Sequence, residues 1–258
     1  MDSIDITYFG QTVSFPNLPR YRKFYARLEA GAWEPATFEV LRQNIDDVTT
    51  YVDVGGWIGA TPFWAAGLAR QVIVVEPDPV CLEILKHYAP RYPNLTLLDG
   101  ALATNREVEL HGVDEFGSSE SSLLESGDGQ ATRVKGLRVA EIMRPAGPGP
   151  VFVKIDIEGY EYAAAKEIAR FAEYDLRGVQ LAVHPQLLEK TLPGGFLRRR
   201  LRTTLATWRL GRIFSGKLGV ARPRHYGSLL GYCLFGVLLR RVPKHTDFVF
   251  LASREPSR

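Results

Sequence analysis

Short apolar runs rich in β-branched residues recur along the chain, separated by longer segments with helical periodicity. A run such as Val-Ile-Val-Val at 72–75 has no polar interruption, which is typical of a strand buried on both faces of a parallel sheet. Strands that alternate with helices imply right-handed crossovers, so the pattern predicts a doubly wound, mostly parallel α/β sheet. The predicted strands span 51–54, 72–76, 95–98, 151–156, 179–183 and 247–252, and the predicted helices span 61–69, 80–88 and 160–172.

Composition and pattern divide the chain into four segments. Apolar residues alternate with polar ones from Ile4 to Tyr8, which predicts a short strand ahead of the core. A Gly-Pro-Gly-Pro sequence forms a hard break before the fourth core strand. The segments are a lead-in or cap (1–49), the α/β core (50–189), a basic, apolar-rich insertion (190–246) and a terminal strand with its tail (247–258). The lead-in contains predicted helices at 24–28 and 35–44. The core contains a peripheral strand at 107–110, a serine-rich loop at 117–126 and the break at 147–150.

Glycines and an acidic residue mark the end of the first core strand. Asp53 lies near the strand end, and Gly55, Gly56 and Gly59 follow, which lets the chain turn sharply and lets a ligand approach the backbone. The helix that begins there offers free N–H groups. Glu76 ends the next strand at the same sheet edge, where a carboxylate can accept two hydrogen bonds from a ribose diol. These positions predict a nucleoside-binding crevice.

Val54 argues against a dinucleotide in this crevice. The fingerprint G-x-G-x-x-G ending at Gly59 would need glycine at position 54. A pyrophosphate needs an anion cradle, whereas Asp53 suits a ligand with positive charge and could hold its amino-acid end or cap the next helix. S-adenosylmethionine, with an ammonium group, a sulfonium and a ribose, fits these residues better. A tight turn without a ligand is the alternative, which Glu76 disfavours.

Further candidates for cofactor contacts end the second and third strands. Asp78 could support the adenosine, or it could simply form a turn before Pro79. Asp99, Gly100 and Ala101 end the third strand, where the adenine is expected. Asp99 could accept a hydrogen bond from the adenine amino group.

Four motifs stand in a characteristic order and spacing: 52–59 (Val-Asp-Val-Gly-Gly-Trp-Ile-Gly), 75–79 (Val-Glu-Pro-Asp-Pro), 117–123 (Gly-Ser-Ser-Glu-Ser-Ser-Leu) and 153–161 (Val-Lys-Ile-Asp-Ile-Glu-Gly-Tyr-Glu). With Trp33-Glu34-Pro35 ahead of them, they resemble the FkbM family of S-adenosylmethionine-dependent methyltransferases, over roughly residues 30–185. The last motif is the most family-specific, and the first two are shared by many class I methyltransferases. The resemblance implies a Rossmann-like class I methyltransferase fold. Such a fold has a mostly parallel seven-stranded sheet, helices on both faces and an antiparallel C-terminal strand. It also implies O-methyl transfer, often to sugars or natural products.

Methyl transfer from a sulfonium is an in-line displacement that demands alignment of the acceptor and escape of its proton. Asp156 ends the fourth strand beside the expected methyl position, and Lys154 and Glu158 share its side of the strand. These charges could tune one another's protonation, or they could form a structural ion pair with Glu158 capping the next helix. His184 could be the general base or a structural residue. Relatives usually carry an acid at the position of Ala182, and this departure weakens the assignment of a base on that strand.

Composition adds no metal or disulfide to this prediction. The spacing of Asp156, Glu158 and His184 is too loose to indicate a Mg²⁺ site, so no metal is predicted. Cys81 and Cys233 lie far apart and form no C-x-x-C pair, which favours a reducing cytoplasm. The 258 residues are 45% hydrophobic and 24% charged, which is ordinary for a soluble globular protein.

A net charge of +3 conceals a strong asymmetry, because residues 190–246 carry 13 of the 32 lysines and arginines and no acidic residue. Leu201, Leu205, Trp208 and Ile213 could form an apolar stripe at helical spacing. The apolar run that follows at 229–239 is too short to cross a bilayer, which needs about 20 residues.

Two interpretations of this basic segment remain open. Residues 196–245 could rest on an anionic membrane surface and receive a lipid-linked or phosphorylated glycan. Alternatively, they form a solvated basic face over a substrate lid, or a homodimer contact. Nucleic acid is disfavoured as a partner because no recognition module is visible.

The sequence therefore predicts a methyltransferase that is cytoplasmic or peripheral to a membrane and methylates a hydroxyl of a small-molecule or glycan acceptor. A cofactor-binding module with weak catalysis is an alternative, which Ala182 leaves open. A nicotinamide-dependent oxidoreductase is a further alternative, which Val54 disfavours.

Overall fold

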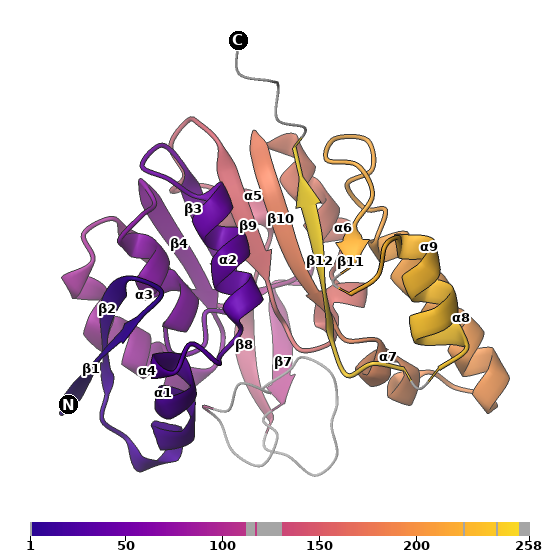
Figure 1. Ribbon diagram of the computed structural model, residues 1–258, viewed down its shortest axis with the longest axis horizontal. Helices are drawn as coiled ribbons and strands as arrows, with labels where there is room; N and C mark the ends of the chain where they lie inside the picture. Colours follow the sequence, from indigo (N-terminus) through magenta and orange to yellow (C-terminus); the bar gives the residue numbers. More distant parts are fainter. Residues whose placement is uncertain (1, 112–116, 118–130, 224, 241, 253–258) are drawn as a thin grey trace.

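The computed structural model describes residues 2–111, 117, 131–223, 225–240 and 242–252 (Figure 1). A large twisted sheet runs through the middle of the described chain, and helices cover both of its faces. The N-terminal elements lie at the left of Figure 1, and the helices of the basic segment lie at the right.

Seven strands form the large sheet: β3 (Thr50–Val54), β4 (Gln71–Glu76), β5 (Leu95–Asp99), β9 (Val151–Ile155), β10 (Leu176–Val183), β11 (Arg222–Pro223) and β12 (Thr246–Leu251). Their order is β11-β12-β10-β9-β3-β4-β5. The strands from β10 to β5 pair in parallel, β12 is antiparallel to β10, and β11 is antiparallel to β12. The predicted Rossmann-like, mostly parallel sheet with an antiparallel C-terminal strand is therefore confirmed.

The strand order reverses at β3, which lies between β4 and β9. The parallel register sets Val54 opposite both Val75 and Ile155, so the three strands end almost level. Residues that follow these strands consequently meet at one edge of the sheet. In open α/β sheets this switch point is where ligands bind.

Alternate residues of β3 point into two different hydrophobic cores. Val52 and Val54 pack in one core with Ile168, whereas Tyr51 packs in the other with Trp64. Burial on both faces explains why the core strands have uninterrupted apolar sequences. The helices next to the sheet are α3 (Ala60–Ala66), α4 (Pro79–Tyr88), η2 (Ala89–Arg91), α5 (Val139–Ile142) and α6 (Ala165–Arg170).

The N-terminal segment packs on the second of these cores. Its elements are β1 (Ser3–Tyr8), β2 (Gln11–Pro16), η1 (Pro19–Tyr21), α1 (Arg22–Glu29) and α2 (Pro35–Asn44). The Tyr8 hydroxyl donates to the Ala60 carbonyl at 2.6 Å, and the Phe38 ring meets Trp64 edge-on. The strand at 4–8 and the helix at 35–44 are confirmed, whereas β2 was not predicted.

The helix predicted over 160–172 is wrong as a continuous element. It consists of η3 (Tyr160–Tyr162), α6 and η4 (Phe171–Glu173). Alanine-rich composition favours a helix, but the side chain of Glu161 turns back to accept hydrogen bonds from the backbone N–H groups of Ile157 and Gly159. These hydrogen bonds hold the first turn against the residues that follow β9, so it does not continue into α6 as one helix.

A small sheet lies beside the end of β5, with the order β6-β8-β7. Its strand β7 (Glu107–His111) confirms the predicted peripheral strand. The other two strands, β6 (Ala101–Leu102) and β8 (Ala131–Leu137), were not predicted. The serine-rich motif at 118–122 lies outside the described residues.

The basic segment folds into α7 (Pro185–Thr191), α8 (Phe196–Leu210), α9 (Leu229–Gly231) and the π-helical η5 (Tyr232–Leu238). Leu210, Phe214, Tyr232 and Val237 lie in the same core as the strands β10 and β12. Of the predicted stripe, Leu201, Leu205 and Trp208 lie in α8 and Ile213 lies beyond its end. Within the described ranges, no helix combines the length and the apolarity needed to cross a membrane.

Candidate functional site

A cavity of about 410 Å³ opens at the edge where β3, β9 and β10 end. Its walls include the turn after β3, the connection between α1 and α2, and residues 244–245. A larger hollow of about 1030 Å³ lies at the opposite edge, where β9 and β10 begin, and none of the predicted site residues lines it. The smaller cavity is lined by six of the predicted residues: Gly55, Gly56, Lys154, Asp156, Glu158 and His184.

The glycines after β3 allow a close approach between neighbouring parts of the protein. Gly55 has a φ of +93°, and a Cβ there would lie 2.0 Å from the carbonyl oxygen of Asp156. Gly59 has a φ of +98°, and a Cβ there would collide with the ring of Phe63. A side chain at Gly56 would collide with a neighbouring valine. Glycine at 55 therefore brings the turn after β3 against the end of β9, which closes one wall of the cavity.

Glu76 is buried at the end of β4 and anchors the turn after β3. Its Oε2 accepts from the Trp57 backbone N–H at 2.8 Å, and its Oε1 accepts from the Asp78 backbone N–H at 2.8 Å. Burial raises the pKa of Glu76 to about 8, although both hydrogen bonds oppose the shift. Each carboxylate oxygen has a second lone pair, so Glu76 can still accept from a ligand hydroxyl.

Asp78 caps helix α4, whereas the predicted alternative to its cofactor role was a turn before Pro79. Its Oδ1 accepts from the backbone N–H groups of Val80 and Cys81. Its Oδ2 accepts from the Gly117 N–H at 2.7 Å, and the Gly117 carbonyl accepts from the indole N–H of Trp57 at 3.2 Å. The peptide of Gly117 is thereby held over the end of β4.

The structure places the predicted adenine contacts outside the cavity. Asp99 lies at the surface, where its carboxylate pairs with Lys86 at 3.0 Å. Gly100 has a φ of +148°, and a side chain there would collide with the Lys135 carbonyl. Ala101 is buried where β6 begins. A separate hollow beside β5 includes Asp99 among its lining residues.

Lys154 is a buried cation between two carboxylates, and it lines the cavity. Its Nζ lies 3.6 Å from Oδ1 of Asp53 and 3.6 Å from Oδ2 of Asp156. Asp53 is fully buried, and its other oxygen accepts from the hydroxyls of Tyr51 (2.9 Å) and Thr61 (2.5 Å). Burial lowers the pKa of Lys154, but Asp53, Asp156 and two further carboxylates outweigh burial, and the net pKa is raised.

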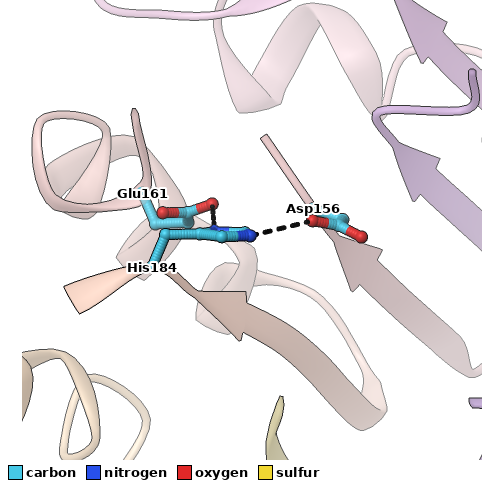
Figure 2. Close-up of side chains that lie close together, drawn as sticks. All are labelled: Asp156, Glu161 and His184. Carbon is cyan, nitrogen blue, oxygen red and sulfur yellow. Dashed lines mark hydrogen bonds and ion pairs between the residues drawn. The ribbon is translucent and has the colours of Figure 1, made fainter. Parts of the chain in front are cut away.

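His184, at the end of β10, lies among three carboxylates. Figure 2 shows its ring between Glu161 and Asp156. Its Nδ1 lies 3.0 Å from Oε1 of Glu161, while its Nε2 lies 3.9 Å from Oδ1 of Asp156 and 3.4 Å from Oε2 of Glu158. Glu161 therefore fixes the ring through Nδ1, and Nε2 is turned toward the cavity side.

The carboxylates set the protonation of this histidine. Burial lowers the pKa of His184, but Glu161, Asp156 and Glu158 outweigh it and raise the pKa to about 9. Burial pushes the pKa of Asp156 up, yet Lys154 and His184 hold it below its usual value. At neutral pH the cluster is therefore an ionised carboxylate beside a protonated imidazole.

Asp156, Glu161 and His184 are also the residues that could hold a metal ion. One ligand atom from each lies within 4.8 Å of the others. The mixture of an imidazole and carboxylates suits several divalent ions, so the geometry does not select one. His184 and Glu161 are hydrogen-bonded to each other through Nδ1 and Oε1.

Several residues in the cavity wall or near it were not predicted as site residues. Glu34 lines the cavity, and burial raises its pKa to about 7. The His245 ring stacks on His184 with a centroid distance of 5.9 Å. Asp247 is the partner of Ala182 in the pairing of β10 and β12, and burial raises its pKa. The Trp33-Glu34-Pro35 motif could have indicated Glu34 from the sequence. The position of Asp247 could not be foreseen, because it depends on the antiparallel register of β10 and β12.

Comparison with known proteins identifies no family. No protein-family profile matches the sequence, and no curated protein shows significant sequence similarity to it.

Solved structures with similar folds are nevertheless found. A fibrillarin pre-rRNA processing protein from Methanococcus jannaschii has a TM-score of 0.46 at 12% identity, over 97% of this chain and 83% of that chain. The methyltransferase FkbM from Methylobacillus flagellatus KT has a TM-score of 0.43 at 18% identity, over 80% of this chain and 44% of that chain. Fibrillarin from Aeropyrum pernix, solved with natively bound S-adenosyl-L-methionine, has a TM-score of 0.42 at 15% identity, over 96% and 82%. At these identities and scores the likeness assigns neither a family nor an activity to this chain.

Proposed function

We propose that the protein is an S-adenosylmethionine-dependent methyltransferase that methylates a hydroxyl group. The observation that carries the proposal is the position of His184. Held by Glu161, it faces a polar cavity at the switch point of the sheet, and Glu76 lies at the end of a neighbouring strand. Ligands of open α/β sheets bind at the switch point, and the oriented imidazole, once deprotonated, supplies a proton acceptor beside it.

The cofactor is assigned to the ends of β3 and β4. Glu76 accepts hydrogen bonds from the ribose hydroxyls with its remaining lone pairs. The turn at 55–59 contacts the methionine part, and its ammonium group is attracted by acidic residues of the cavity wall such as Glu34 and Asp156. Lys154 reduces the repulsion between the two carboxylates on either side of it, so this wall of the cavity stays fixed when the cationic ligand enters.

Methyl transfer then follows a balanced displacement. The acceptor oxygen attacks the methyl carbon, the O–C bond forms as the S–C bond breaks, and the sulfonium becomes the neutral thioether of S-adenosylhomocysteine. When the imidazole of His184 is deprotonated, the hydroxyl proton passes to its Nε2, while its Nδ1–H donates to Glu161. The raised pKa makes this form a minority at neutral pH and the main form above about 9. An orienting carboxylate behind the imidazole is the arrangement that lets histidine act as a general base.

A sugar, glycan or natural-product hydroxyl suits the lining of this cavity. Charged and polar side chains from several elements line it, namely Arg27, Glu34, Lys154, Glu158, Lys244 and His245. Such a wall can hydrogen-bond an acceptor with many hydroxyls, whereas an apolar acceptor would remove these groups from water without offering hydrogen bonds in return.

Calorimetry and a transfer assay test the proposal. We expect S-adenosylmethionine and S-adenosylhomocysteine to bind the wild-type protein, with no binding of NAD. Methyl groups labelled on S-adenosylmethionine should then appear on an acceptor from a panel of sugars, glycans and polyphenols. Binding of NAD alone would overturn the cofactor assignment. Binding of S-adenosylmethionine by a protein that transfers no methyl group to any of the panel would instead favour the cofactor-binding module, which Ala182 leaves open.

A further inference from the structure

Large apolar side chains are exposed mainly on the basic segment. Of eleven large apolar residues that are exposed in the described part of the chain, eight lie in or beside α8, α9 and η5. Leu239 and Phe235 are 68% and 58% exposed. Single exposed apolar residues are ordinary, but such a concentration marks a surface that contacts something.

Helix α8 has three distinct sides. Its side against the protein carries the buried residues Arg200, Thr203, Thr207 and Leu210. Leu197, Leu201 and Leu205 follow one another at intervals of four residues and are exposed, so they form one stripe. At about 100° per residue, three exposed arginines lie along the edge of that stripe, and these are Arg198, Arg202 and Arg209.

Arg200 joins α8 to the neighbouring helices. Unlike the arginines at the edge of the stripe, it is buried. Its guanidinium donates to Glu189 of α7 at 2.7 Å and to the carbonyl of Val237 in η5 at 2.9 Å. Helices α8 and η5 therefore lie side by side as one unit, as Figure 1 shows for α8 and α9. We call the exposed side of this unit, with Leu197, Leu201, Leu205, Leu230, Phe235 and Leu239, the α8–η5 face.

We propose that the α8–η5 face docks on a bilayer that contains anionic phospholipid. Charge complementarity selects this occupant, because residues 190–246 carry thirteen basic residues and no acidic one. Leucine and phenylalanine side chains enter the boundary between headgroups and acyl chains, while arginines at their edge contact lipid phosphates. Neither helix is long enough to span, so the protein lies on the surface.

A second copy of the chain fits this face poorly. A twofold interface brings the same surface of both copies together, so the arginines of one copy would face those of the other. The segment has no carboxylate to separate them. A bilayer of anionic lipid supplies the missing negative charge.

The docked surface is connected to the cavity at both ends of the segment. Helix α7 begins directly after His184, and the chain returns to β12 through Lys244 and His245. All three residues line the cavity. Docking would therefore hold the cavity near lipid headgroups, where a lipid-linked acceptor is presented.

Vesicle flotation without cofactor or acceptor tests this proposal independently of the proposed function. The probes are vesicles of phosphatidylcholine alone and vesicles with about 30% phosphatidylglycerol, at low salt and at about 0.5 M NaCl. We expect wild-type protein to float with the anionic vesicles at low salt, and the bound fraction to fall at least about 10-fold in the other conditions. Absence of flotation with anionic vesicles would overturn the proposal.

Two sets of variants separate the apolar and the charged contributions. Leu201→Ser/Leu205→Ser/Phe235→Ser and Arg198→Gln/Arg202→Gln/Arg209→Gln should each lower the partition coefficient at least about 10-fold. The matched controls change exposed residues elsewhere, namely Val48→Ser, and Arg22→Gln/Lys23→Gln/Arg106→Gln, and should float like wild type.

Near-UV circular dichroism checks that every variant is folded. Equal flotation of the folded face variants and the controls would overturn the proposal. Sedimentation equilibrium provides a second check. A stable dimer that dissociates in the apolar variant, together with no vesicle binding, would assign the face to a second copy instead.

Discussion

Nδ1 of His184 lies 3.0 Å from Oε1 of Glu161, although the two residues are 23 positions apart. Glu161 lies in η3, and His184 directly follows β10. The same carboxylate oxygen accepts from the backbone N–H groups of Ile157 and Gly159. The turn after β9 therefore fixes the carboxylate of Glu161, and this carboxylate in turn holds the imidazole at the end of β10. The histidine is oriented by the backbone of a neighbouring strand end, so its position does not depend on a flexible side chain alone.

Replacing Glu161 by glutamine should shift the pH dependence of methyl transfer. In the wild type the pKa of His184 is about 9, so the free base needed for catalysis forms only as the pH rises toward that value. Glu161 raises this pKa more than the other carboxylates do. Glu161→Gln should therefore move the rise of kcat/KM to lower pH, toward the ordinary histidine pKa of about 6.5. The maximal rate should fall about 10- to 100-fold because the ring is less firmly oriented.

The amide oxygen of the introduced glutamine can still accept from the backbone N–H groups, so the Glu161→Gln variant should fold. Titration of the His184 ring by NMR then measures its pKa directly. Because the pKa of folded His184 is raised, the cluster stabilises the fold fully below pH 6.5 and loses this contribution as pH rises through about 9. Glu173→Gln, at an exposed carboxylate, is the control. A pH–rate profile identical to wild type in Glu161→Gln would contradict the role of His184 as base.

Lys154→Met should strongly destabilise the fold. The substitution leaves Asp53 and Asp156 without the cation that both of them contact. Breaking a buried ion pair from one side costs about 3–5 kcal/mol of unfolding free energy. Urea unfolding at pH 7 measures the loss, and part of it should be recovered at pH 5, where a carboxyl group that has lost its cation can take up a proton. Lys86→Met removes an exposed pair with Asp99 and should change stability by less than about 1 kcal/mol.

Glu76→Ala should weaken the binding of S-adenosylmethionine about 10-fold, since each hydrogen bond contributes about 0.5–1.5 kcal/mol and the carboxyl group can contact both ribose hydroxyls. Isothermal titration calorimetry measures the affinity. The variant also leaves the Trp57 and Asp78 N–H groups without their acceptor, so its melting temperature must be recorded alongside. Asp99→Ala, whose side chain lies at the surface outside the cavity, should retain wild-type affinity. Unchanged affinity in folded Glu76→Ala protein would remove the ribose assignment.

Chelation should leave methyl transfer unchanged. The imidazole of His184 is held by Glu161 and accepts the proton itself, so the proposed displacement uses no ion. Activity should survive dialysis against EDTA and should not rise when Mg²⁺, Mn²⁺ or Zn²⁺ is restored. A loss on dialysis that one of these ions reverses would reassign Asp156, Glu161 and His184 as metal ligands, which their spacing allows.

The positions of the core strands and the ends of the first two could be predicted from the sequence because their causes are local. Uninterrupted apolar runs such as 72–75 identify strands buried on both faces. Glycine at 55 and 59 marks positions of positive φ, and Asp78 before Pro79 marks the start of a helix, where it forms the cap. The strand endings confirm that Asp53 and Glu76 lie near one edge. The pattern failed at 160–172, where Glu161 turns back toward β9 and the helix is broken.

Only the tertiary structure decided which side chains meet. The pairing of His184 with Glu161, the approach of His245, and the position of Asp247 opposite Ala182 each depend on how distant strands align. Periodicity states which face of an element is apolar, but not which element covers it. For this reason the sequence showed an apolar stripe in the basic segment, whereas the fold determined that Leu201 and Leu205 remain exposed while Arg200 is buried against Glu189 and η5.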